Sequence, residues 1–220
     1  MIKYVLFDLD GTLLSTLDTI TYHLNGALSG SGLDTITIND TRSFIGNGAK
    51  KLVARAVAKS GVTDESVVAE VLSKYNLAYD ADPLPCTEPY EGIVDLVNTL
   101  CSREIKLAVV TNKPDDTAKK LINHFFPGCF EAVSGGKAGA VLKPDPTESL
   151  AVLLGMGGNA FECAFVGDTS VDILTGKNIG AALSIGVSWG FRTREELTSA
   201  GADRIADTAK DLLVILGGEL

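Results

Sequence analysis

Two aspartates stand two residues apart near the start of the chain, in the segment Asp8-Leu9-Asp10-Gly11-Thr12. The preceding run, Tyr4-Val5-Leu6-Phe7, is rich in β-branched and aromatic residues and is typical of a buried strand. Side chains two residues apart on a strand point the same way, and Gly11 then allows a sharp turn. Reactive groups collect at the carboxyl ends of strands in open parallel sheets, so two acids stand where a site is expected. An ordinary acidic turn is the alternative explanation of this segment alone.

Further polar residues stand where a predicted strand ends or a predicted helix begins. They are Thr111, Asn112, Lys143, Asp168 and Asp172. Each has a structural alternative: Thr111 is a possible helix N-cap, Lys143 a solvated lysine, and the two aspartates a cap and a first-turn acid. Because the strands of a parallel sheet end at one edge, we expect these groups to converge with Asp8 and Asp10.

The elements that position these residues alternate between strand and helix in the second part of the chain. Strands are predicted over residues 105–110, 130–133, 164–166 and 181–187, with helical spacing of apolar residues between them. Such alternation implies a parallel sheet with helices on both faces. A nucleotide-binding Rossmann module is disfavoured, because no GxGxxG motif follows the opening strand.

Residues 15–87 predict helices and no convincing pair of strands. Apolar residues recur at helical spacing from Leu17 to Leu28, and further helices are expected over about 50–60 and 64–80. A proline-rich stretch around residues 83–89 marks the exit from this segment. The predicted fold is therefore α/β, with residues 1–14 and 88–220 as the core and 15–87 as an inserted helical cap domain.

The composition limits the classes of partner. The chain has 220 residues, of which 45% are hydrophobic, and the mean hydropathy is +0.21, so a sizeable core is expected. The net charge of −9 argues against nucleic acid as a partner, and an anionic substrate would need a metal or well-placed cations. No apolar run approaches the roughly 18 residues of a membrane helix, and no signal peptide stands out, so a cytoplasmic protein is expected.

The four cysteines are Cys86, Cys101, Cys129 and Cys163. They are widely scattered and lack the spacing of a zinc site or a disulfide framework, which favours reduced thiols in the core.

The same polar residues carry a resemblance to a known family. Four segments resemble, in order, the four signatures of the haloacid dehalogenase-like hydrolase superfamily: Asp8-Leu9-Asp10-Gly11-Thr12-Leu13, Val110-Thr111-Asn112-Lys113, Lys143-Pro144-Asp145-Pro146 and Gly167-Asp168-Thr169-Ser170-Val171-Asp172. The resemblance covers essentially the whole chain and is closest to the phosphoglycolate phosphatase-like group, which has a helical cap inserted after the first signature. It implies a Rossmann-like parallel sheet core.

The resemblance also implies roles for the acids. Asp8 would be the nucleophile that forms an aspartyl-phosphate, and Asp10 would protonate the leaving alkoxide and later activate water. Mg²⁺ would be held by Asp8, by the backbone carbonyl of Asp10 and by Asp168. Asp172 would act through water or by orienting Asp168. An oxygen-rich carboxylate site suits Mg²⁺.

Two polar segments would complete the phosphate site. Thr111 and the Asn112 backbone would bind the phosphoryl oxygens, and Lys143 would neutralise their charge. The substrate would be a small-molecule phosphate ester, with 2-phosphoglycolate as the leading candidate. A cap residue such as Arg42 or Lys50 would then bind the carboxylate, although a solvated basic helix face explains these residues equally well.

Several alternatives stay open. A pyrophosphatase or a phosphotransferase of the β-phosphoglucomutase type would share the site, and a non-catalytic phosphometabolite-binding protein is the alternative of another class. A dehalogenase and a phosphonate hydrolase are disfavoured because neither needs Asp10. Ser15 and Thr175 stand where many relatives have aspartate and alanine, which weakens the finer subgroup assignment. A monomer or a homodimer is expected.

Overall fold

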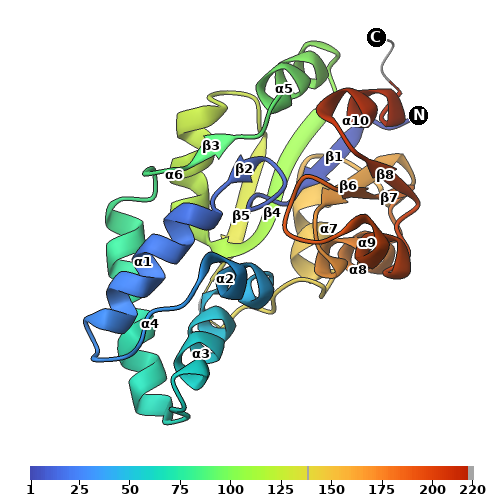
Figure 1. The fold of residues 1–220 in the computed structure, drawn as a ribbon. Helices are drawn as coiled ribbons and strands as arrows, with labels where there is room; N and C mark the ends of the chain where they lie inside the picture. The colour runs from blue at the N-terminus through green and yellow to red at the C-terminus, as the bar shows by residue number, and fades with distance from the viewer. Residues whose placement is uncertain (138, 218–220) are drawn as a thin grey trace.

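The central feature of the computed structural model, which describes residues 1–137 and 139–217, is a six-stranded sheet in the order β5-β4-β1-β6-β7-β8 (Figure 1). Its strands are β1 (Tyr4–Phe7), β4 (Lys106–Pro114), β5 (Ala132–Gly136), β6 (Cys163–Gly167), β7 (Leu183–Val187) and β8 (Arg204–Ala206). All neighbouring strands run parallel. The strand order proceeds in opposite directions on the two sides of β1, and ligands bind at such switch points in open α/β sheets.

Helices cover both faces of this sheet. They are α5 (Ile93–Ser102), α6 (Asp115–Phe125), α7 (Thr147–Gly155), α8 (Ser170–Asn178), α9 (Arg194–Ser199) and α10 (Ala209–Ile215), together with the short 3₁₀ helix η1 (Ala160–Glu162). Alternate residues of β1 enter different apolar clusters: Val5 and Phe7 pack with α5, α6 and α10, whereas Leu6 packs with Leu153 and Phe165. The continuous apolar run of β1 is thus explained by burial on both faces.

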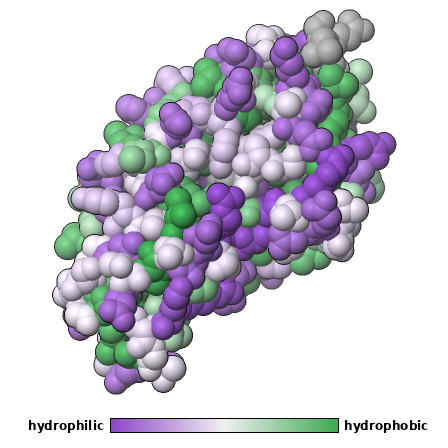
Figure 2. Space-filling model, in the orientation of Figure 1, coloured by the Kyte–Doolittle hydropathy of each residue, from purple (hydrophilic) through white to green (hydrophobic). Residues whose placement is uncertain are grey.

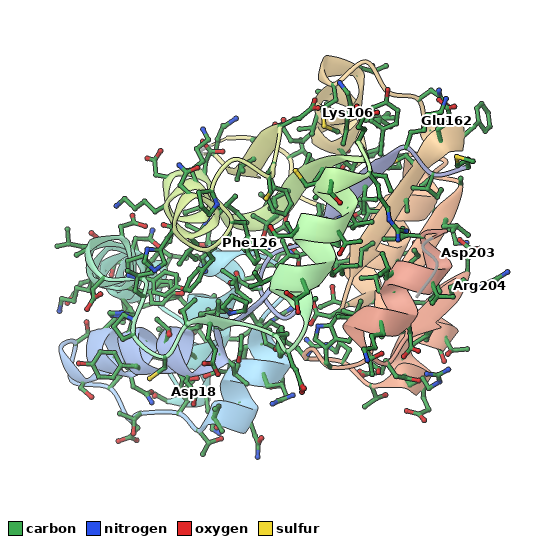
Figure 3. The ribbon with its side chains drawn as sticks, turned by 90° about the horizontal axis from the view of Figure 1, so that it is seen from above. Asp18, Lys106, Phe126, Glu162, Asp203 and Arg204 are labelled. Atoms are coloured by element: carbon green, nitrogen blue, oxygen red, sulfur yellow. The ribbon has the colours of Figure 1, made fainter. Side chains whose placement is uncertain are left out.

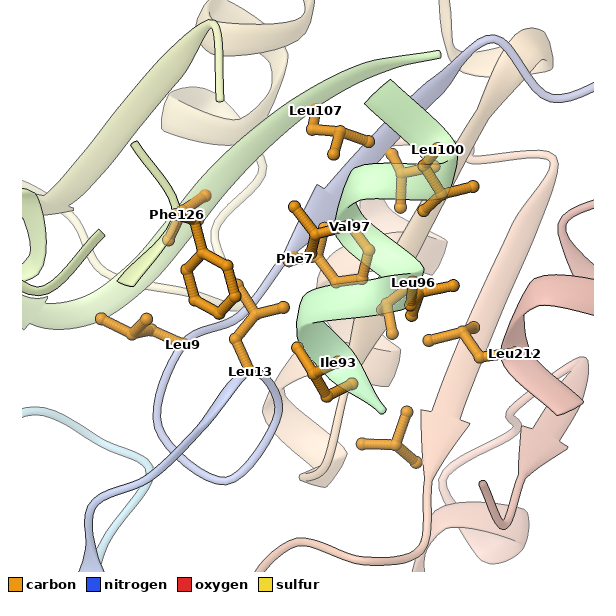
Figure 4. Packing of buried hydrophobic residues seen from close by; sticks show 14 of the residues in the cluster. Phe7, Leu9, Leu13, Ile93, Leu96, Val97, Leu100, Leu107, Phe126 and Leu212 are labelled. Carbon is orange, nitrogen blue, oxygen red and sulfur yellow. The ribbon is translucent and has the colours of Figure 1, made fainter. Parts of the chain in front are cut away.

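Helix α5 shows how sequence spacing produces this packing. Ile93, Leu96, Val97 and Leu100 recur at helical spacing and are almost fully buried. They face Phe7 and lie over β1 in Figure 4. This packing fixes the strand that ends immediately before Asp8.

The four cap helices are α1 (Leu17–Ser29), α2 (Ile38–Phe44), α3 (Ala49–Lys59) and α4 (Glu65–Ala81). They share an apolar cluster of their own, which Phe191 enters from the core. The chain leaves for the cap and returns from it through an antiparallel pair, β2 (Leu14–Ser15) and β3 (Glu88–Pro89). Figure 3 shows Asp18 of the cap and Asp203 of the core at opposite ends of the molecule.

The predicted fold class, an α/β Rossmann-like core with an inserted helical cap, is confirmed. The division into 1–14 with 88–220 and 15–87 stays our interpretation. As expected, residues 15–87 contain helices and no pair of strands among themselves, because β2 and β3 pair at the two ends of this segment. The expectation of core thiols is wrong for Cys86 and Cys101, which are exposed, whereas Cys163 is buried. Helix α2 and the elements after β7 were not predicted, because β8 has three residues and α2, α9 and α10 have six or seven.

The surface carries hydrophilic residues over much of the face in Figure 2, with hydrophobic residues in scattered patches. Within residues 1–137 and 139–217, every helix falls short of the length and apolarity that a membrane crossing demands.

Candidate active site

The turn after β1 brings the first two acids to the carboxyl edge of the sheet. The Asp8 amide donates to the Val166 carbonyl of β6 at 2.9 Å, which continues the strand pairing to the catalytic edge. Gly11 has a φ of +86°, and a Cβ at this position would collide with the Asp168 carboxylate. Glycine is therefore required both for the turn and for the close approach of Asp168.

Thr111 and Asn112 lie in the irregular end of β4, where its pairing with β5 shifts between Val110 and Pro114. Thr111 is thus a strand residue and not a helix N-cap. The Asn112 side chain accepts a hydrogen bond from the Lys143 amide at 2.9 Å and donates to the Lys143 carbonyl at 3.1 Å. It also donates to the Gly46 carbonyl of the cap at 3.2 Å. Asn112 therefore fixes the segment that carries Lys143.

Lys143 lies between two acids from different elements. Its ammonium is 2.8 Å from Asp8 Oδ1 and 2.8 Å from Asp172 Oδ1, and its side chain is 4% exposed. Asp172 is held in turn by the start of α8, where its Oδ2 accepts from the Thr169 amide and hydroxyl at 2.9 and 2.7 Å. Asp172 therefore contacts Lys143 and, as the expected first-turn acid, completes the capping box of α8, in which Thr169 and not Asp168 is the N-cap.

Asp168 is fully buried and held from two sides. Its Oδ1 accepts from the Thr12 hydroxyl at 3.1 Å, and its Oδ2 accepts from the Phe191 amide at 2.7 Å. A Cβ at Gly190 would collide with the Asp168 side chain, so the loop after β7 also needs glycine for this approach. The turn after β1 and the loop after β7 thus orient one carboxylate toward Asp8.

Asp8, Asp168 and Asp172 form a group that could hold a metal ion. Each offers a carboxylate oxygen, and these atoms lie within 4.8 Å of one another. Among the described residues, Asp8 Oδ1 is a buried oxygen that receives no well-directed hydrogen bond, despite its short distance to Lys143. Close, buried carboxylates with spare acceptor capacity are the donor set that a hard divalent cation prefers.

The electrostatics of this group follow from burial. Burial raises the pKa of Asp8 to about 6, although Lys143 opposes the shift. Burial, reinforced by Asp172 and Asp8, raises the pKa of Asp168 well above its usual range. For Lys143, burial lowers the pKa but the charges of Asp172 and Asp8 outweigh it, so the net direction is upward and the ammonium is retained. Lys143 offsets part of the repulsion at Asp8 and Asp172, but burial and the charges of the neighbouring acids still leave the pKa values of Asp8 and Asp168 raised.

The metal-free protein should therefore become more stable when Asp8 is replaced by asparagine. The unfolded carboxyl titrates near about 3.9, whereas the folded one holds its proton to about pH 6, so this group makes stability fall as the pH rises through that interval. At pH 7.5 the free energy of unfolding of Asp8→Asn should exceed that of the metal-free wild type by at most about 3 kcal/mol. Urea unfolding in excess chelator at pH 4.5 and 7.5 measures it. A variant less stable than the wild type at pH 7.5 would contradict this account.

A further lysine and two tyrosines of the site were missed as functional residues. Lys113 contacts Asp10 at 2.9 Å and the Tyr79 hydroxyl at 2.6 Å. Tyr75 and Tyr79 come from α4 and line the same cavity as Asp8 and Asp10. The available signal was weak: Lys113 belongs to the second signature segment, while the tyrosines fit the apolar spacing of a helix.

The cavity is walled by both parts of the molecule. The core contributes Asp8, Asp10, Thr111, Asn112, Lys113, Pro114, Lys143, Thr169, Asp172 and Phe191. The cap contributes residues of α1, of α4, of the turn before α3 and of the start of α3. Arg42 and Lys50 are exposed residues that are not part of the wall. Arg42 Nη1 instead lies 3.4 Å from the Gly190 carbonyl. Substrate binding by these two residues stays a prediction.

The family model described as haloacid dehalogenase-like hydrolase matches residues 5–185. A phosphoglycolate phosphatase of Rhodospirillum rubrum is 34% identical over 213 residues, covering 94% of this chain and 88% of that protein. Phosphoglycolate phosphatase 1 of Pseudomonas aeruginosa is 34% identical over 213 residues, covering 93% and 78%. A solved structure from Lactobacillus delbrueckii subsp. bulgaricus is 33% identical, has a TM-score of 0.91 and covers 99% of both chains.

The chain therefore belongs to the haloacid dehalogenase-like hydrolase family. The resemblance inferred from the four signature segments is confirmed, and the two relatives described above are phosphoglycolate phosphatases.

Proposed function

We propose that this protein is a Mg²⁺-dependent phosphomonoester hydrolase that works through an aspartyl-phosphate on Asp8. The observation that carries the proposal is the Asp8 carboxylate itself. It is buried at the switch point of the sheet, lies 2.8 Å from the Lys143 ammonium and faces the acids Asp168 and Asp172. A carboxylate in such a place can attack phosphorus only when cations offset the charge of the phosphate.

The proposed reaction has two steps. In the first, an Asp8 oxygen forms a bond to phosphorus while the bond from phosphorus to the leaving oxygen breaks, and Asp10 gives that oxygen a proton. In the second, water attacks the phosphoenzyme, Asp10 takes its proton, and inorganic phosphate leaves as Asp8 is restored. Thr111 and the Asn112 backbone orient the phosphoryl oxygens, and Lys143 offsets their charge. Positioning and electrostatics dominate transfers of this kind.

The metal would be held by Asp8 and Asp168, with Asp172 and the Asp10 backbone carbonyl as the remaining candidates. When bound, Mg²⁺ supplies positive charge next to the phosphoryl group and the Asp8 carboxylate. The close approach of the three buried carboxylates and the repulsion among them support this assignment.

The substrate we propose is 2-phosphoglycolate, because the two relatives described above are phosphoglycolate phosphatases. Helix α3 supports a second anionic group near the phosphate. Its N-cap residue Gly48 and its residues Ala49 and Leu52 border the cavity. Gly48 provides no side-chain cap, and the first turn contains Lys50 and Lys51 without an acid. The amide groups at a helix start attract anions. The positive charge of Lys50 would add to this attraction and favour a carboxylate here even without contact. A cytoplasmic location belongs to the same proposal.

A substrate panel tests the function. With Mg²⁺, kcat/KM for phosphoglycolate should exceed that for an uncharged phosphoester of similar size by roughly tenfold to a hundredfold, the value of one charge-assisted contact. Excess chelator should abolish the activity. Pyrophosphate, β-glucose 1-phosphate and a nucleoside monophosphate complete the panel.

The variants Arg42→Ala and Lys50→Ala separate the cap contributions, with the exposed Lys210→Ala in α10 as control. A clear preference for pyrophosphate would indicate a pyrophosphatase instead. Isomerisation of the sugar phosphate would indicate a phosphotransferase of the β-phosphoglucomutase type. Equal rates on all substrates in every variant would mean that the cap recognises no carboxylate.

A further inference from the structure

The cavity contains a second buried lysine for which the proposed reaction has no role. The side chain of Lys113 is 2% exposed, and its ammonium lies 2.9 and 3.2 Å from the two oxygens of Asp10. The same ammonium lies 2.6 Å from the hydroxyl of Tyr79, which comes from cap helix α4. One cation therefore connects the acid–base carboxylate of the core to a residue of the cap.

We propose that Lys113 is a positioning residue that holds the Asp10 carboxylate for proton transfer, and that Tyr79 holds Lys113 in turn. The inference rests on the proposed acid–base role of Asp10. In this arrangement the cap helps to orient the acid–base group and does more than close over the substrate.

The hydrogen-bonding capacity of the ammonium favours positioning over substrate binding. An ammonium has three N–H donors, and the two oxygens of Asp10 and the Tyr79 hydroxyl together account for all three. Contacts to both carboxylate oxygens restrict the rotation of the Asp10 side chain, which is only 14% exposed. A small misplacement of a reacting group can cost about 10²-fold in rate, so this restriction matters for turnover.

The position of Tyr79 is well determined by its neighbours in the cap. Its ring stacks on Tyr75 at 5.5 Å and meets the His23 ring edge to face at 5.3 Å. His23 is itself hydrogen-bonded to the Asp82 carbonyl at 2.8 Å. The Lys113 ammonium also lies 4.3 Å from the centre of the Tyr79 ring, a cation–π contact. The cap therefore presents a rigid acceptor to Lys113.

A double-mutant cycle tests the proposal. Lys113→Met should lower kcat for an alkyl phosphate about 10- to 100-fold while KM changes less than about threefold. Lys113→Arg should recover part of the loss because it restores the cation. In an Asp10→Asn background, Lys113→Met should cause no further loss, since it would act through a group already removed.

Two further variants make the test independent of folding. Tyr79→Phe keeps the ring and removes the hydroxyl, and should lower kcat about threefold to tenfold in the wild type but not in Asp10→Asn. The matched control is Lys120→Met, because the Lys120 ammonium also reaches the cap, at the Asp80 carbonyl 2.8 Å away, without touching Asp10. Its kcat should stay at the wild-type value.

The outcomes distinguish a failure of the positioning role of Lys113 from a failure of the proposed function. Losses that add to that of Asp10→Asn, or a rise in KM alone, would overturn the positioning role while leaving the proposed function intact. If Lys113→Met fails to fold, Tyr79→Phe decides by the same criterion. Full activity of Asp10→Asn by itself would remove the acid–base role of Asp10, and both ideas would fall together.

Discussion

Asp8→Asn should abolish turnover of every phosphate ester, with a loss on the order of 10⁴-fold or more. An amide oxygen is too weak a nucleophile to form the phosphoenzyme, and a lost nucleophile commonly removes nearly all covalent catalysis. Steady-state release of inorganic phosphate measures the loss. Asp18→Asn, at an exposed position of cap helix α1, is the matched control and should remain fully active.

The same variant also separates catalysis from folding. Asp8→Asn is expected to be inactive yet at least as stable as the metal-free wild type, because it removes one member of a repelling acid cluster. Acid-quenched wild-type enzyme should carry one phosphoryl group on Asp8 by mass spectrometry, and the variant should carry none. Normal turnover in Asp8→Asn, or a phosphoryl group on another residue, would contradict the proposed mechanism.

The core of the fold could be predicted because its signals are local. Buried parallel strands leave continuous apolar runs such as Tyr4-Val5-Leu6-Phe7, and α5 has its apolar residues at helical spacing. The turns at Gly11 and Gly190 depend instead on tertiary contact, since both glycines make room for Asp168. The strand β8 has only three residues and is stabilised by pairing with β7, which the sequence of β8 does not reveal.

The core half of the candidate site was predictable for the same reason. Asp8 and Asp168 directly follow strands, and the topology of a parallel sheet brings such positions together. Lys143 was expected at a helix start but lies in a turn before α7, where the side chain of Asn112 holds its backbone. The placement of the cap depends on how its helices pack on the core. The basic residues Arg42 and Lys50 therefore looked like the cations of the cavity, whereas the structure places Lys113 there.

Electrostatic properties were the least predictable part. A carboxylate in the sequence carries no sign of its burial, yet burial is the largest cause of the raised pKa values of Asp8 and Asp168. Likewise, Tyr79 fits the apolar spacing of α4 in the sequence. Only its contact with Lys113 in the structure connects it to the candidate active site.

Asp10→Asn should preserve phosphoryl transfer from an aryl phosphate to Asp8 but slow the hydrolysis of the phosphoenzyme. With an aryl phosphate the leaving group departs without a proton, so phosphoryl transfer to Asp8 should continue. Hydrolysis of the phosphoenzyme should slow by about 10²- to 10⁴-fold, the usual range for general acid–base catalysis, because the asparagine amide accepts no proton from water.

Rapid mixing of Asp10→Asn with p-nitrophenyl phosphate should therefore release a burst of nitrophenol of about one equivalent per active site, followed by a slow steady state. With an alkyl phosphate such as phosphoglycolate, both steps need Asp10, so the variant should show no burst and a rate lower by at least the same factor. Asp116→Asn, an exposed acid in the first turn of α6, should behave as the wild type on both substrates. Wild-type turnover of the alkyl phosphate by Asp10→Asn would leave Asp10 as a structural turn residue or a backbone ligand, and the two-step assignment would have to be abandoned.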